Sequence, residues 1–163
     1  MSHNGSVVIE DEQSQKYHFI GLVYDRLSST SRKPTLEEWV KLAYETAQAL
    51  DHLHTIGNAY KITIEEIYYC HKTQCYKVMV FPQKTPISVQ DSIHQFGQTL
   101  WPLLKGLYQS PTLKAMPHAH ETMLQDIGLL LFKMRQTPPS VEMTEIIQKL
   151  EFLQALLQPQ RGP

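Results

Sequence analysis

The stretch Ala49–Phe81, ALDHLHTIGNAYKITIEEIYYCHKTQCYKVMVF, decides how this chain is organised. It predicts the end of an amphipathic helix, a turn at Gly57–Asn58, a short irregular loop and then a β-hairpin. The hairpin strands are expected at Glu66–Cys70 and Tyr76–Phe81, because both segments are rich in Tyr, Val and Ile and the polar turn His71–Gln74 separates them. Helix, loop and hairpin are therefore expected to follow one another directly.

A long helix is predicted upstream of the turn. Thr35 and Glu38 fit a capping box, in which the threonine hydroxyl accepts from the backbone of residue 38 and the glutamate bonds back. From there to about His54, apolar or small residues recur every three or four positions, as on the buried face of a helix: Leu36, Trp39, Ala43, Thr46, Leu50 and Leu53. Similar patterns predict two further helices, Thr122–Arg135 and Val141–Leu157.

Composition is that of an ordinary globular protein, with 42% hydrophobic and 19% charged residues. The net charge of −1 disfavours a dedicated nucleic-acid binder. No apolar stretch reaches membrane-spanning length, and the start of the chain lacks a signal-peptide pattern. Two cysteines, Cys70 and Cys75, do not make a secreted disulfide framework. We therefore expect one cytoplasmic domain that engages neither nucleic acid nor membrane.

The order of these parts resembles the catalytic core of the protein kinase family. In that family a helix ending in Leu-x-x-Leu-His leads into a His-Arg-Asp loop and then into a hairpin ending in Asp-Phe-Gly. Further along, Ser92–Trp101, SIHQFGQTLW, resembles the signature of the central kinase helix, Asp-Val-Trp-Ser-Phe-Gly-x-x-Leu-Trp. The resemblance implies a mainly α (α+β) fold: a kinase C-lobe-like helical domain with two small β-hairpins.

The resemblance covers residues 5–157, nearly the whole chain. It implies a remnant hairpin and hinge at 5–27, the long helix at 35–55, a degenerate catalytic loop and hairpin at 57–82, C-terminal helices at 90–157 and a tail at 158–163. The remnant hairpin is expected as strands Val7–Asp11 and Tyr17–Tyr24. The glycine-rich strands, the Val-Ala-Ile-Lys strand and the glutamate-bearing helix of the kinase N-lobe find no counterpart.

The groups that carry phosphoryl transfer in the family are replaced here. Ile62 stands where the family has the catalytic Asp, Ile67 where it has the magnesium-binding Asn, and Val80 at the Asp of Asp-Phe-Gly. Hydrocarbon side chains cannot ligate magnesium. Other family positions are also changed: Tyr60 replaces His, Lys61 replaces Arg, Ile64 replaces Lys, and Ser92 replaces the Asp that holds the loop from below. Phe81 and Pro82 follow Val80 at the second and third positions of the Asp-Phe-Gly motif. The resemblance thus implies a pseudokinase without catalytic residues, cofactor or metal.

The favoured interpretation is a protein-interaction module, acting as a scaffold or regulator in signalling. The edge of the remnant hairpin is expected to be unpaired and open to a partner strand, with five candidate interface residues: Val7, Ile9, Phe19, Ile20 and Leu22. Ile62, Ile64 and Ile67 are expected to form a second apolar patch facing the cleft.

Three alternatives stay open. The chain could be a fragment of an ATP-dependent protein kinase, or retain weak ATP binding through the backbone of Asp25 and Leu27, which the resemblance places in the hinge. It could instead be a generic helical domain whose helix ends read like those of a kinase. Cys70, His71 and Cys75 could suggest zinc, but they lack the spacing of a structural zinc site; we expect the cysteines to face one another as small apolar groups.

Overall fold

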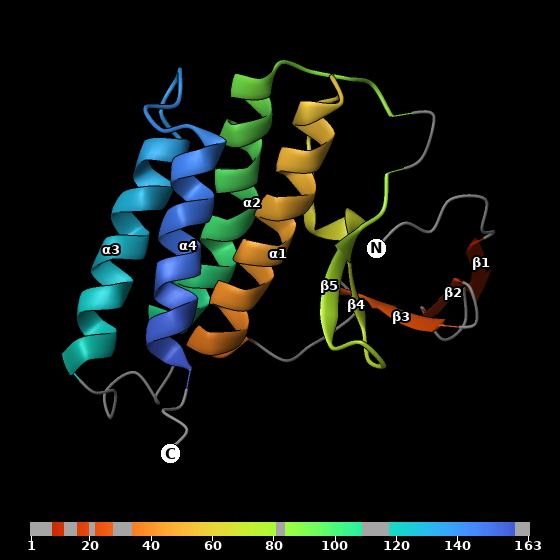
Figure 1. The fold of residues 1–163 in the computed structure, drawn as a ribbon, viewed down its shortest axis with the longest axis horizontal. Coiled ribbons are helices and arrows are strands. Elements are labelled where there is room, and N and C mark those ends of the chain that lie inside the picture. Colours follow the sequence, from red (N-terminus) through yellow and green to blue (C-terminus); the bar gives the residue numbers. More distant parts are fainter. Residues whose placement is uncertain are drawn as a thin grey trace.

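The computed structural model describes residues 8–11, 16–19, 22–27, 34–80, 84–108 and 118–158; for residues 8–24 it describes the backbone only. Four α-helices lie in this part of the chain: α1 (Leu36–Thr55), α2 (Val89–Tyr108), α3 (His118–Met134) and α4 (Met143–Leu157). They form a bundle, with a β-sheet beside α1 (Figure 1). The expected fold class, mainly helical with a small antiparallel sheet, is confirmed at this level.

Helix α1 forms as the sequence predicts. The Thr35 hydroxyl accepts from the Glu38 amide at 3.2 Å, and the Glu38 carboxylate accepts from the Thr35 amide at 3.1 Å, so the capping box is present. Five of the six residues in the predicted stripe are buried, and Leu53 packs against the core. Trp39 is fully buried, and its indole N–H donates to the Leu100 carbonyl at 3.3 Å, which joins α1 to α2.

The sheet has five antiparallel strands in sequence order: β1 (Val8–Asp11), β2 (Lys16–Phe19), β3 (Leu22–Arg26), β4 (Ile67–Cys70) and β5 (Cys75–Val78). Two expectations are wrong here. The segment 17–24 is two strands rather than one. The first hairpin is not separate, because β3 pairs with β4 through Asp25 opposite Tyr69. One edge of this hairpin, β3, therefore lies inside a continuous sheet, whereas β1 stays at the end of the strand order.

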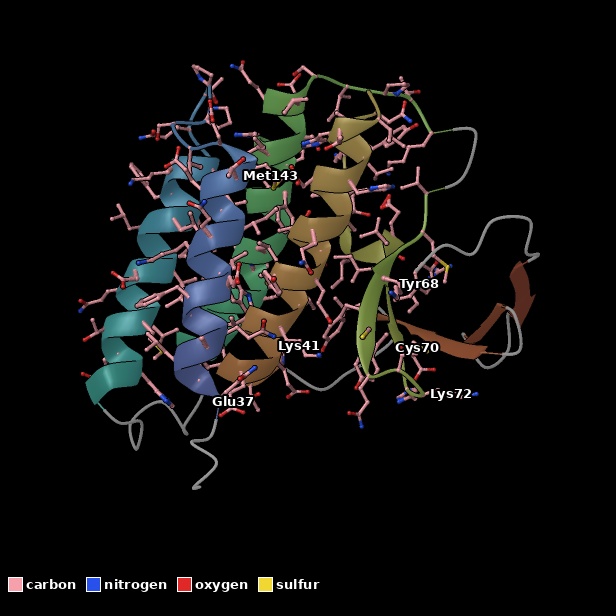
Figure 2. All side chains as sticks on the ribbon, viewed as in Figure 1. Glu37, Lys41, Tyr68, Cys70, Lys72 and Met143 are labelled. Atoms are coloured by element: carbon pink, nitrogen blue, oxygen red, sulfur yellow. The ribbon has the colours of Figure 1, made fainter. Side chains whose placement is uncertain are left out.

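Strand β4 is buried on both faces. Successive side chains of a strand point to opposite faces, so its neighbouring residues are buried in different surroundings. Ile67 lies in the helical core. Tyr68 and Cys70, both labelled in Figure 2, lie on the other face of the strand and outside that core, and they are 1% and 0% exposed. At the other side of the hairpin the Tyr76 amide donates to the Glu45 carboxylate on α1 at 2.9 Å. The sheet is thus fastened directly to the bundle.

Helices α2, α3 and α4 begin earlier or later than the sequence suggests. Helix α2 begins at Val89 because the Ser88 hydroxyl accepts from the Asp91 amide at 3.0 Å, a cap that the sequence interpretation overlooked. Helix α3 begins at residue 118 and α4 at residue 143. On α2, a Cβ at Gly97 would lie 3.0 Å from side-chain atoms of α3 and the residue after it, so glycine permits close helix packing there.

Candidate functional site

The loop after α1 turns where the sequence predicts. Gly57 adopts a φ of +87°, which favours glycine, and its amide donates to the His54 carbonyl at 3.0 Å. The next amide, that of Asn58, donates to the Leu53 carbonyl at 2.8 Å. These bonds end α1 and direct residues 59–66 across the bundle towards β4.

Two hydroxyls on α2 hold this loop. The Ser92 hydroxyl donates to the Tyr60 carbonyl at 2.8 Å, and two helical turns later the Thr99 hydroxyl donates to the Ile62 carbonyl at 2.7 Å. Ser92 occupies the position that the kinase resemblance assigns to an anchoring Asp. The sequence interpretation did not foresee that a neutral hydroxyl would hold this loop.

His54 completes this network. Its Nε2 lies 3.0 Å from the Ser92 hydroxyl, which donates its own proton to Tyr60. Nε2 therefore carries the ring proton, and Nδ1 is buried with no hydrogen-bond partner in the described part of the chain. Burial lowers the pKa of His54 below its ordinary value of 6.5, and the charge of Asp51 opposes this shift only in part.

The Ser92–His54 pair is not a nucleophile and base. Ser92 is 0% exposed, so no substrate carbonyl reaches its hydroxyl, and that hydroxyl donates to a backbone oxygen rather than to the imidazole. The pair instead satisfies buried polar groups between α1, α2 and the loop. Its role in the described structure is to hold the loop.

The isoleucines of the loop do not form a patch facing a cleft. Ile62 is 1% exposed and Ile67 0% exposed, and both belong to the main hydrophobic core. Val80 is partly buried against the same core, whereas Ile64 lies half-buried in the 3₁₀ turn Ile64–Glu66. The expected apolar patch is wrong because the chain folds two of its three members inward.

The other replaced positions have different surroundings. Tyr60 packs against the core and Lys61 is exposed. Phe81 and Pro82 lie outside the described residues.

A partly buried ion pair fixes the end of the loop. The Glu66 carboxylate binds Lys84 and accepts from the Thr63 hydroxyl and amide at 2.8 and 3.0 Å. Burial by itself would raise the pKa of Glu66, but the hydrogen bonds from Lys84 and Thr63 and the charge of Lys84 outweigh it, so the pKa lies below its ordinary value. Lys84, from the segment after the hairpin, is thereby tied to the loop.

The hinge candidates lie within the sheet or at its end. Asp25 has a register partner on each side, Lys16 in β2 and Tyr69 in β4, and its carboxylate binds His71 at the hairpin turn. A residue inside two ladders uses its backbone N–H and C=O in strand pairing. Its backbone is therefore poorly placed to recognise a nucleotide, and Leu27 directly follows the strand.

The five candidate interface residues are only partly described. Val7 and Ile20 lie outside the described residues, and only the backbones of Ile9, Phe19 and Leu22 are described. Ile9 lies in β1, the edge strand, which pairs with β2 alone among the described strands. Partner binding at this edge stays a prediction.

The cysteines face one another across the hairpin as expected. Cys70 is the register partner of Cys75, and both are free thiols. Within the described ranges, no three His, Cys, Asp or Glu side chains gather in a way that could hold a metal ion.

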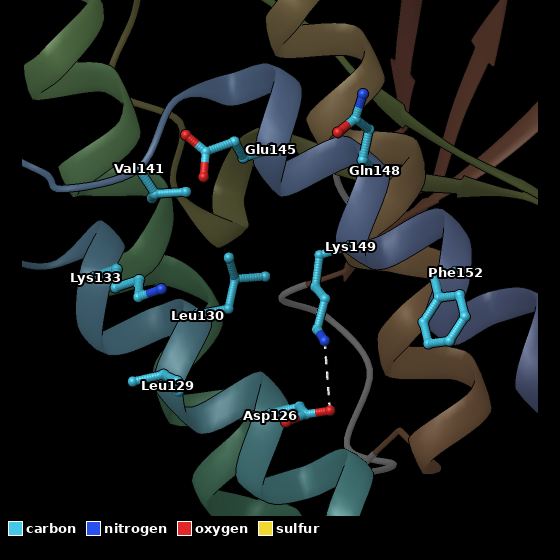
Figure 3. A pocket seen from close by; sticks show the side chains of 9 residues that line it. All are labelled: Asp126, Leu129, Leu130, Lys133, Val141, Glu145, Gln148, Lys149 and Phe152. Carbon is cyan, nitrogen blue, oxygen red and sulfur yellow. Dashed lines mark hydrogen bonds and ion pairs between the residues drawn. The ribbon is translucent and has the colours of Figure 1, made fainter.

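A groove between α3 and α4 was missed by sequence reasoning. It has a volume of about 440 Å³, and Leu130 and Val141 are its buried lining residues (Figure 3). Polar and apolar side chains from both helices line the rest: Asp126, Leu129, Lys133, Glu145, Gln148, Lys149 and Phe152. Lys149 lies 3.4 Å from the Asp126 carboxylate and 5.9 Å from the centre of the Phe152 ring.

Large apolar side chains are exposed around this groove. Leu129 and Phe132 on α3 are both 55% exposed, and Phe152 and Leu156 on α4 are 56% and 51% exposed. Their positions off the buried stripe of each helix were the available signal in the sequence.

Comparison with known proteins adds no relative, because no protein-family model matches the chain and no curated protein matches its sequence. Among the helices that the structure describes, none is both long enough and apolar enough to cross a membrane.

Proposed function

We propose that this chain is a catalytically inactive, kinase-like domain that acts as a protein-interaction module. The observation that carries the proposal is the burial of Ile62 and Ile67, which stand at the positions of the catalytic Asp and the metal-binding Asn in the kinase resemblance. These side chains contribute to the hydrophobic core. They offer no oxygen to a magnesium ion and no base to a substrate hydroxyl.

The surroundings of the loop support the same proposal. Ser92 and Thr99 hold the loop through neutral hydroxyls at 2.8 and 2.7 Å, so a rigid loop is kept without the anionic anchor of an active kinase. The interaction role is supported by the four exposed apolar side chains on α3 and α4, since clusters of this kind mark protein-binding surfaces more often than isolated ones do.

Nucleotide binding provides the first test. A ligand present at 100 times its Kd stabilises a protein by about 2.7 kcal/mol, which corresponds to roughly 5–10 °C in Tm for a domain of this size. We expect no change in Tm when ATP is added with or without magnesium. A magnesium-dependent rise, together with phosphate transfer that survives purification, would contradict the proposal.

Photo-crosslinking in the native cell tests the interaction role. A photoreactive amino acid at Phe132 is expected to give discrete protein adducts, because this side chain is exposed and follows the groove-lining Leu129 by one helical turn. The same amino acid at Val89, an exposed apolar position on α2, is the matched control and should give none of them. Equal adduct patterns from both positions would count against a binding surface on α3 and α4.

A further inference from the structure

We propose that the partner of the α3–α4 face is a second copy of this chain, packed face to face about a two-fold axis. The α3–α4 face is defined by residues of the groove and its rim: Asp126, Leu129, Phe132 and Lys133 on α3, and Glu145, Lys149, Phe152 and Leu156 on α4. The inference rests on the proposed function, because it names the partner of the surface proposed there.

Most of the exposed large apolar side chains in the described structure lie on the α3–α4 face. Among the described side chains, six large hydrophobic ones are exposed, and four of them lie on this face at 51–56% exposure. On their opposite sides α3 and α4 bury Ile127, Leu131 and Leu153 completely. Helices that are apolar on two sides are typical of elements packed on both sides. In the described structure only one side of each is covered.

The shape of the groove suits a helix of the partner. The groove runs between two helices whose far neighbours are α2 for α3 and α1 for α4 (Figure 1). Its lining includes buried apolar side chains of Leu130 and Val141, and the exposed Leu129 and Phe152 stand at its sides (Figure 3). An apolar ridge formed by a helix fits such a groove. Leu129 and Phe132 lie one helical turn apart on α3 and are both exposed, so α3 of a second copy supplies a ridge of this kind.

The charges of the groove favour a second copy of the chain over a strongly charged partner. The lining carries two acidic residues, Asp126 and Glu145, and two basic residues, Lys133 and Lys149. A strongly acidic or basic partner would therefore gain little from this face. Lys149 and Asp126 are paired within the chain, which leaves one acidic and one basic residue, Glu145 and Lys133, for a partner. A second copy can pair each of them with the other across a two-fold axis, and the chain's net charge of −1 gives little repulsion between copies.

Sedimentation velocity of the full chain tests the proposal directly. Between about 1 and 200 μM, a range that brackets weak dimers, wild type is expected to shift from monomer to dimer. Combined Leu129→Glu and Phe152→Glu substitutions should leave a folded monomer, because both side chains are exposed. The matched control Val89→Glu, at another exposed apolar site, should dimerise as wild type does. Wild type that stays monomeric throughout, or a double variant that still dimerises, would overturn the proposal.

Charge reversal provides a specific second arm. Lys133→Glu with Lys149→Glu makes the lining wholly acidic and should weaken self-association at least about tenfold. Asp126→Lys with Glu145→Lys makes it wholly basic and should do the same. Mixing the two variants should restore dimers, now as heterodimers. A mixture that stays monomeric would overturn the two-fold pairing.

The crosslinking experiment separates this inference from the proposed function. Adducts at Phe132 with twice the mass of the chain support a second copy. Adducts with a different protein alone would overturn the second copy as occupant while leaving the interaction role intact. The absence of any adduct from this face would count against both.

Discussion

Replacing Ser92 by alanine tests whether neutral hydroxyls hold the loop. The substitution removes the bond to the Tyr60 carbonyl at 2.8 Å and the bond from His54 Nε2 at 3.0 Å, at a side chain that is fully buried. Leaving a buried donor or acceptor without a partner costs about 1–3 kcal/mol. Alanine returns roughly 0.5 kcal/mol in helix propensity, and His54 is only partly buried. We therefore expect a net loss of about 2 kcal/mol in the free energy of unfolding.

Urea unfolding, followed by far-ultraviolet circular dichroism, measures this loss. The slope of free energy against urea should stay constant, because the surface exposed on unfolding barely changes. Ser140→Ala is the matched control, since this exposed serine follows the α3 turn, and it should change stability by less than about 0.5 kcal/mol. The reasoning is refuted if Ser92→Ala costs no more than the control.

A double-mutant cycle isolates the histidine. If His54 donates to the Ser92 hydroxyl, the double variant Ser92→Ala, His54→Phe should lose less stability than the two single losses combined, by about 1 kcal/mol. Strict additivity would show that the two side chains do not interact in solution.

Three further predictions follow from burial. Ile62→Asp should destabilise the fold by more than about 4 kcal/mol, because an unpaired carboxylate would enter the core. The control Lys61→Asp, at the exposed neighbouring position, should be tolerated. The Tm values of the two variants in thermal unfolding test this, and equal Tm values would contradict the burial of Ile62. The pKa of His54 is lowered in the folded state, so the unfolded state binds more protons near pH 6. The contribution of neutral His54 to the free energy of unfolding is therefore complete above about pH 6.5 and is lost as the pH falls from there through the folded-state pKa. Urea unfolding at several pH values should show this loss in wild type and a smaller loss in His54→Phe, and identical pH profiles would refute it. Thr46→Val should stabilise the fold by about 1 kcal/mol, because the Thr46 hydroxyl is buried on α1 with no hydrogen-bond partner among the described residues; a lower urea midpoint for this variant would show that the hydroxyl has a partner.

Local chemistry in the sequence was enough to place much of the fold. The capping box at Thr35, the apolar stripe of α1, the glycine turn and the hairpin turn all depend on residues within a few positions of one another. Each of these features is present. The antiparallel facing of Cys70 and Cys75 was predictable for the same reason, because a short turn fixes the register of a hairpin.

Features that depend on distant residues were not predictable in this way. The partner of Ser92 lies 32 positions earlier in the chain, and β3 pairs with β4 across the whole of α1. That Ile62 and Ile67 stand in place of polar residues follows only from the kinase resemblance and stays a prediction. Whether those side chains turn inward or face solvent is decided by how α1, α2 and the loop pack together. The same is true of the α3–α4 groove, which requires knowing which apolar residues the bundle leaves uncovered.

The bond from the Tyr76 amide to the Glu45 carboxylate bears on how this sheet could aggregate. Strand β5 lies at one end of the sheet order, where an exposed amide would invite another chain to add a strand. A helix carboxylate occupies that donor instead, so the sheet is protected from growth at the β5 end. Loss of Glu45 should therefore free this amide and make the β5 end more open to an added strand.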